Sequence, residues 1–175
     1  FSDVLQGEPA NLVGDFVKYH QQHGGVSRYE KFRHFFVNMK KISEADQEIL
    51  SSIDRFANIV EKGLLECEFV PGVLEFFNKI MIIGIPMFVV SGSDEKELNK
   101  VFHKRGILRF FKQVYGSPLN KKDNLRKVIK RIGAQKKGIF FGDSRSDYDA
   151  ALKYGLDFVF VNGLSEWKYI NSSTA

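Results

Sequence analysis

From Glu68 onward the chain alternates short apolar runs with segments of helical pattern, which restricts it to a small group of folds. The apolar runs are the predicted strands, at residues 85–90, 113–115, 139–141 and 158–161. Because helical segments separate consecutive strands, the strands are expected to pair in parallel through right-handed crossovers. We therefore predict an α/β fold, with a parallel sheet flanked by helices.

Residues 1–66 carry no run of strand type, and we predict that they are helical throughout. Apolar side chains recur at helical spacing over residues 11–22, and Ser27 and Glu30 have the spacing of a capping box that opens a second helix. We predict two units, a small all-helical bundle at residues 1–66 and an α/β core at residues 67–175.

Composition narrows the class of protein further. The chain has 26 Lys and Arg against 21 Asp and Glu, a net charge of +5, and the basic residues are spread along it. Since nucleic-acid binders gather basic residues on one face, we expect no nucleic-acid partner, and a mild positive field would suit a small anionic substrate. No apolar run approaches the ~20 residues of a membrane helix, and Cys67 is the single cysteine. We expect a cytoplasmic protein without a membrane partner.

An acid pair follows the predicted strand at residues 139–141. Asp143 and Asp147 stand four residues apart where the chain turns from strand to helix. In an open parallel sheet, ligands bind at this place, and paired carboxylates there suit a hard cation such as Mg²⁺. The alternative is a helix-capping Asp beside a surface Asp, and the spacing alone leaves both open.

Two more loops should end at the same sheet edge. Ser91, Gly92 and Ser93 combine hydroxyls with a permissive glycine before a predicted helix, which fits an anion cradle or a simple helix cap. Lys121 and Lys122 open another predicted helix, where cations are disfavoured, so they indicate a nearby anion or a solvated pair. A hydroxyl, an ammonium and an acid pair at one edge are typical of a phosphoryl-transfer site.

Three short motifs resemble a known family. Ser91 follows "MFVV", a lysine follows "GSP", and "FFGDSRSD" holds the acid pair. In order and spacing, over residues 68–165, these resemble the second, third and fourth motifs of the haloacid dehalogenase superfamily, in its Mg²⁺-dependent phosphatase branch. Residues 1–66 are similar to the helical cap of that branch, and the closest likeness is to the phosphoglycolate phosphatase-like group. The resemblance implies a Rossmann-like core.

The resemblance also implies roles for single residues. Ser91 and the backbone N–H of Gly92 would hold the transferring phosphoryl group. Lys121 would neutralise the phosphate and the nucleophile, with Lys122 as a rival for that role.

The same likeness implies a metal ion and a substrate contact from the cap. Asp143 would bind Mg²⁺, and Asp147 would bind it or orient its waters. In the cap, Arg28 and Lys31 are candidate contacts to a substrate anion, with a solvated helix start as the alternative.

The family's first motif is missing from the sequence. Members carry a strand ending in Asp-x-Asp-Gly, whose first Asp is the nucleophile, and neither Asp3 nor Asp15 stands in such a context. In this fold that strand lies in the middle of the sheet, between the strands that end at Val90 and Phe141. We therefore expect an N-terminally truncated chain, without its central strand and inactive as it stands.

The sequence thus predicts a Mg²⁺-dependent phosphomonoester hydrolase that acts on a small phosphorylated metabolite through an aspartyl-phosphate. Two alternatives stay open: a non-catalytic module that binds a phosphorylated ligand or partner, and a phosphomutase. Neither the particular substrate nor the oligomeric state can be predicted.

Overall fold

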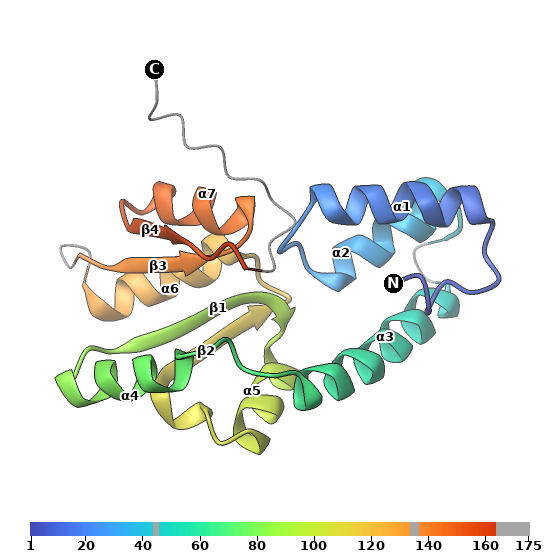
Figure 1. Ribbon diagram of the computed structural model, residues 1–175. Helices are drawn as coiled ribbons and strands as arrows, with labels where there is room; N and C mark the ends of the chain where they lie inside the picture. Colours follow the sequence, from blue (N-terminus) through green and yellow to red (C-terminus); the bar gives the residue numbers. More distant parts are fainter. Residues whose placement is uncertain (44–45, 134–136, 164–175) are drawn as a thin grey trace.

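The computed structural model describes residues 1–43, 46–133 and 137–163. The end of the predicted core, residues 164–175, lies outside this range. The first helices are α1 (Ala10–Gln22), α2 (Arg28–Arg33), which continues into a π-helical segment (His34–Met39), and α3 (Gln47–Glu66). The elements that follow are α4 (Val73–Ile83), β1 (Met87–Asp94), α5 (Glu95–Lys104), β2 (Phe111–Ser117), α6 (Lys121–Ile132), β3 (Ile139–Gly142), α7 (Arg145–Lys153) and β4 (Asp157–Phe160) (Figure 1).

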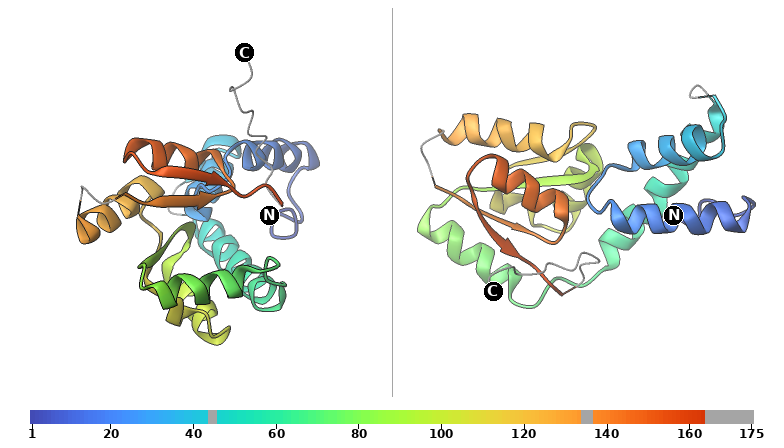
Figure 2. Two further views of the ribbon diagram at one scale, coloured as in Figure 1. Left: turned by 60° about the vertical axis from the view of Figure 1, so that its left-hand side comes forward. Right: turned by 90° about the horizontal axis from the view of Figure 1, so that it is seen from above.

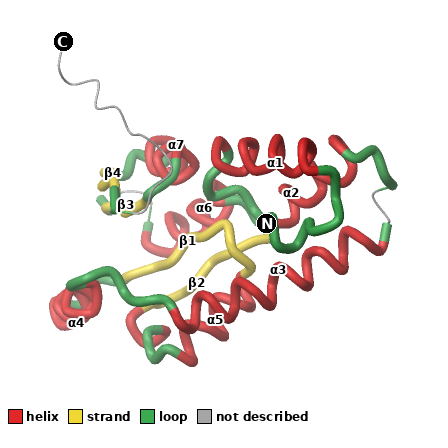
Figure 3. The backbone as a smooth tube through the Cα atoms, turned by 45° about the vertical axis from the view of Figure 1, so that its right-hand side comes forward, coloured by secondary structure: helices red, strands yellow, loops and turns green. Residues whose placement is uncertain are grey.

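The strands form two parallel pairs. β1 pairs with β2 and β3 pairs with β4, and within the described ranges β1 and β3 are not hydrogen-bonded to each other. The predicted α/β class with parallel strands and flanking helices is confirmed. The strands lie in two separate two-stranded sheets, with no strand between β1 and β3 among the described residues (Figure 3).

One apolar layer connects the two strand pairs. Leu125 and Val128 of α6 and Ala150 of α7 are buried, and side chains from both sheets pack against them. Phe88 and Val90 come from β1, and Phe140 comes from β3, so side chains from both sheets share the layer formed by α6 and α7.

A continuous apolar run such as residues 139–141 is typical of a strand that is buried on both faces, but here one face is exposed. Ile139 and Phe141 are 59% and 50% exposed, whereas Phe140 between them packs on α6 and α7. Successive side chains of a strand point to opposite faces. The face that carries Phe141 is left largely uncovered by the described residues.

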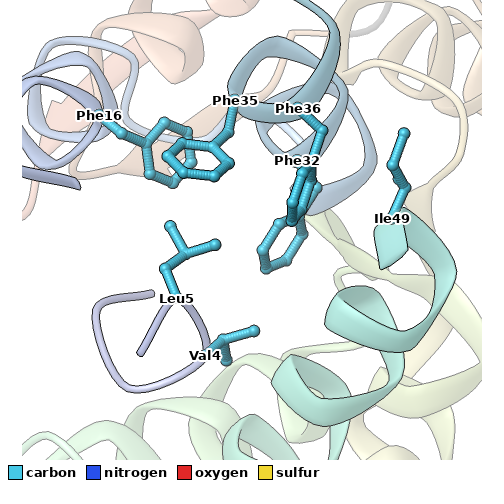
Figure 4. Close-up of a cluster of buried hydrophobic side chains, with 7 residues drawn as sticks. All are labelled: Val4, Leu5, Phe16, Phe32, Phe35, Phe36 and Ile49. Atoms are coloured by element: carbon cyan, nitrogen blue, oxygen red, sulfur yellow. The ribbon is translucent and has the colours of Figure 1, made fainter. Parts of the chain in front are cut away.

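The helices α1 to α3 enclose a core of their own (Figure 4). Phenylalanines fill it, with Phe16, Phe32, Phe35 and Phe36 all at 1% exposure or less. Phe16 and Phe35 meet edge to face with ring centroids 5.1 Å apart, the geometry that aromatic quadrupoles favour. This core shares no buried residue with the layer beneath the strands.

The strands of both sheets run toward the helical unit, so their carboxyl ends face α1 and α2 (Figures 1 and 2). Loops that follow β1, β2 and β3 therefore meet the turn between α1 and α2. Among the described residues, no helix combines the length and the apolar content needed to cross a membrane.

Candidate active site

Ser91 and Gly92 lie in the last part of β1. The strand continues through both residues to Asp94, with an irregularity in its pairing after Val90. Asp94 caps α5, since its Oδ1 accepts hydrogen bonds from the backbone N–H groups of Lys96 and Glu97. The structure thereby assigns the cap to Asp94, and Ser91 accepts a bond from the Ser93 N–H at 3.1 Å.

The loop after β2 is held by side chains from two helices. Glu95 Oε2 accepts the N–H of Gly116 at 3.0 Å, and Asn124 Nδ2 donates to the Gly116 carbonyl at 2.8 Å. Asn124 is fully buried and also donates to the Leu119 carbonyl, at 3.2 Å. These bonds fix the backbone that leads into Lys121 at the start of α6.

Lys121 joins this loop to the loop after β3. Its Nζ lies 2.5 Å from Asp147 Oδ1 and 3.2 Å from Ser144 Oγ. The Lys121 and Asp147 side chains are only 10% and 6% exposed. Lys121 thus contacts Asp147 of the acid pair, whereas its rival Lys122 is exposed and lines the neighbouring cavity.

Asp147 is a helix-capping residue as well as a member of the acid pair. It forms a capping box with Ser144, whose N–H and Oγ donate to Asp147 Oδ2 at 3.1 and 2.6 Å. Gly142 passes so close that a methyl group on it would lie 2.7 Å from the Asp147 Cγ. The local sequence thus holds the Asp147 carboxylate between a glycine, its own cap and Lys121.

The residues at this edge fit Mg²⁺ by the chemistry of their donors. Mg²⁺ is commonly held by one or two carboxylates together with waters and substrate phosphate oxygens. Asp143 is exposed at the end of β3 and Asp147 lies one helical turn further. Among the described residues, no group of three or more Asp, Glu, His or Cys side chains is placed to hold a metal ion.

Gly25, in the turn between α1 and α2, contacts all three loops. A methyl group on Gly92 would collide with the Gly25 carbonyl oxygen, and one on Gly25 would lie 2.5 Å from Lys121 Nζ. The same methyl group would collide with Ser146 Oγ. The φ of Gly25 is +76°, a conformation that glycine adopts without strain.

A cavity of about 430 Å³ opens beside this turn. The helical unit lines it with Gly25, Val26, Ser27 and Glu30, and the core contributes Gly92, Lys121, Lys122 and Ser146 among others. The cavity brings backbone, hydroxyl, ammonium and carboxylate groups together between the two units.

The two cap cations do not line this cavity. Arg28 is 5% exposed and binds Glu97 of α5 through two hydrogen bonds, so the predicted substrate contact is engaged elsewhere. Lys31 is 3% exposed within the helical unit, where its Nζ donates to His20 Nδ1 at 2.6 Å. The alternative of a solvated helix start is wrong for both, because neither is at the surface.

Tyr29 makes a second contact across the two units. Its hydroxyl donates to Asp94 Oδ2 at 2.9 Å. Burial raises the pKa of the Tyr29 hydroxyl above its ordinary value, and the hydrogen bond to Asp94 raises it further. The roles of Glu97 and Asn124 escape sequence reasoning, because their partners lie in other elements. The Gly24-Gly25 pair, by contrast, is visible in the sequence as a helix stop.

A comparison with models of protein families assigns the chain to a family. The family model described as haloacid dehalogenase-like hydrolase matches residues 16–161. The chain therefore belongs to the haloacid dehalogenase-like hydrolase family, as the three motifs indicated. A search of curated protein sequences gives no significant match.

Solved structures of the same fold are similar to this chain. A Clostridium difficile protein assigned as a phosphatase has 19% identity and a TM-score of 0.59, over 74% of this chain and 63% of that one. A predicted phosphoglycolate phosphatase from Haemophilus somnus has 17% identity and a TM-score of 0.66, over 91% and 72%. A Bacillus subtilis protein assigned to the same hydrolase family, solved with magnesium, has 16% identity and a TM-score of 0.63, over 95% and 80%. The chain thus spans less than two thirds of the first of these proteins.

Proposed function

We propose that the protein is a Mg²⁺-dependent phosphomonoester hydrolase acting on a small phosphorylated metabolite. The observation that carries this proposal is the meeting of three strand-end loops around Gly25. These loops supply the Gly92 backbone, the Lys121 ammonium and the Ser146 hydroxyl. Preorganised donors and a cation at one point suit the charge that develops on a transferring phosphoryl group.

Each group has a defined part in this proposal. Ser91 and the Gly92 N–H would hold the phosphoryl oxygens, and Lys121 would neutralise their charge. Asp143 and Asp147 would hold Mg²⁺, which would supply charge neutralisation at the phosphate. Family membership and the phosphatase assignments of similar structures support the reaction class.

The nucleophile in this proposal is an aspartate from a segment outside residues 1–175. No Asp-x-Asp-Gly occurs in the sequence, and the edges of β1 and β3 that face each other are unpaired within the described ranges. The aspartate oxygen would attack phosphorus as the bond to the leaving oxygen breaks, and water would then cleave the aspartyl-phosphate.

The test begins with the coding sequence upstream of Phe1 and continues with the full-length protein. We expect an apolar strand ending in Asp-x-Asp-Gly, and release of inorganic phosphate from a panel of phosphomonoesters that stops when a chelator removes the metal. Transfer to an acceptor hydroxyl in place of water would identify a phosphomutase. No cleavage across the panel, together with no upstream motif, would favour the non-catalytic binding module.

A further inference from the structure

Two side-chain contacts tie the start of α2 to the start of α5. The guanidinium of Arg28 donates to both oxygens of Glu97, at 3.0 and 2.6 Å. One residue further, Tyr29 donates to Asp94, which caps α5. Both contacts reach the helix that begins immediately after Ser91, Gly92 and Ser93, so they couple the helical unit to the proposed phosphate-binding loop.

These contacts hold Gly25 over that loop. Only two residues separate Gly25 from Arg28, and the Gly25 backbone lies against both Gly92 and Lys121. There is no room for even a methyl group on the facing sides of Gly25 and Gly92. A phosphate group, which is much larger, cannot stand between Gly92 and Lys121 while Gly25 is seated there.

The Arg28–Glu97 contact is the strongest candidate for what keeps Gly25 in place. The Arg28 side chain is 4% exposed and that of Glu97 is 24% exposed, and the guanidinium also lies over the Phe56 ring. Bidentate, charge-assisted hydrogen bonds of this kind are among the stronger polar contacts in proteins. Removing one partner leaves the charge of the other buried and unpaired.

The other ion pairs between the two units are more exposed. Glu61 of α3 bridges Lys100 and Lys104 of α5, whose side chains are 54% and 47% exposed. Exposed pairs of this kind contribute little to stability. Glu61 therefore provides a matched control, since it joins the same two units through Lys100 and Lys104, about one and two helical turns along α5 from Glu97.

We propose that Arg28 and Glu97 form a latch that seats the Gly25 turn on the phosphate-binding edge and closes it. Arg28 is then a positioning residue, acting through Glu97. The inference rests on the proposed function, because the space that the latch closes is the proposed phosphate site. A ligand that binds only the open state has an apparent affinity that is proportional to the fraction of open molecules. The latch therefore sets how tightly a phosphate group is held.

The separation of the two units tests the latch without a substrate. Spin labels at Gln21→Cys in α1 and Leu152→Cys in α7, in a Cys67→Ser chain, report that separation by pulsed electron resonance; all three positions are exposed. The parent should show one short distance. Arg28→Gln and Glu97→Gln should each lower the closed-to-open ratio about tenfold or more, because each strands a charge. Glu61→Gln should keep the parent distribution.

Two results would overturn the latch. One is a parent-like distance distribution in folded Arg28→Gln and Glu97→Gln chains. The other is equal opening in Glu61→Gln, which would make every contact between the units equivalent. If Arg28→Gln does not fold, Glu97→Gln carries the test, since Glu97 is the more exposed partner.

A titration with inorganic phosphate separates this inference from the proposed function. If both are right, Arg28→Gln and Glu97→Gln bind phosphate more tightly than the parent, by up to the factor by which the open fraction rises. Adding Lys121→Met to either variant should abolish that gain. If the labels show opening but no variant binds phosphate, the latch is supported and the proposed phosphate site is wrong.

Discussion

Lys121 Nζ and Asp147 Oδ1 lie 2.5 Å apart, in an ion pair that is almost closed to water. The pair joins the loop after β2 to the helix after β3. Each of the two side chains also has a different proposed partner. Lys121 is the proposed phosphate contact, and Asp147 is a proposed Mg²⁺ ligand. Each can take up its proposed partner only by weakening its bond to the other, so phosphate and metal should influence each other through this pair.

Removing the Lys121 charge should strengthen metal binding. We expect Lys121→Met to raise the affinity for Mn²⁺, a spectroscopic substitute for Mg²⁺, by about tenfold or more. Tenfold corresponds to about 1.4 kcal/mol, less than the ~4 kcal/mol expected for two unit charges 4 Å apart near a protein surface. The free Mn²⁺ signal in electron paramagnetic resonance measures the affinity. Lys122→Met is the matched control, and an equal gain there would contradict the direct competition.

The two lysines should also differ in catalysis. In the full-length protein, Lys121→Met should lower kcat by about 10²–10³, the usual loss when one preorganised group that stabilises the transition state is removed. Lys122 is exposed, and its replacement should change kcat less than about threefold. Steady-state kinetics on the best substrate of the panel decide this. A larger loss for Lys122→Met would reassign the role.

The sequence was sufficient for the fold class because strand and helix periodicities are local. Residues 139–141 are a strand in the structure, as their apolar run predicts, but the exposure of Phe141 depends on which elements lie over it. The apolar content of a short strand does not reveal whether both faces are covered.

The candidate site divides in the same way. The sequence placed Lys121 and Asp147 at one sheet edge, because strand order brings their loops together. It could not show that the two side chains form an ion pair with each other, because the choice of partner depends on side-chain geometry. Arg28 was predicted to face a substrate, but its partner Glu97 stands 69 positions away, and no local pattern connects them.

Asn124 should be a stabilising residue of the loop that precedes Lys121. Asn124→Ala leaves the carbonyls of Gly116 and Leu119 without their side-chain donor, and we expect a loss of about 2–3 kcal/mol in the free energy of unfolding. Asn78 is the matched control, because it also donates to a backbone carbonyl but is exposed. Asn78→Ala should cost less than about 0.5 kcal/mol. Urea denaturation measures both, and equal losses would contradict the importance of burial.

Two glycine replacements should act in opposite directions. Gly142→Ala places a methyl group against Asp147, and we expect a loss of about 2–3 kcal/mol because the capped carboxylate must move. Gly14 lies in α1, and a methyl group there would contact nothing within 4 Å. Gly14→Ala should stabilise the protein by about 0.5–1 kcal/mol through helix propensity. Thermal and urea unfolding test both, and a stable Gly142→Ala chain would contradict the observed close approach.

The helical unit should lose stability in mild acid through His34. Its ring stacks on Tyr19 with centroids 3.9 Å apart, and Asn38 Nδ2 lies 3.2 Å from its Nδ1. Burial lowers the pKa of His34 below the ordinary value of 6.5, and the nearby His23 lowers it further.

The direction of the pH effect follows from that lowered pKa. The unfolded chain takes up a proton at His34 near pH 6.5, whereas the folded chain takes it up only at lower pH. Protonation therefore favours the unfolded state, and stability is lost as the pH falls from 6.5 through the pKa of the folded state.

Urea midpoints at pH 8 and at about pH 5.5, a unit below the ordinary histidine value, measure this loss. His34→Gln should start from a lower stability at pH 8, because it lacks the stacking on Tyr19. It should then lose less between the two pH values than the parent does, since it has no proton to take up. An equal loss in both proteins would show that the acid sensitivity comes from other groups.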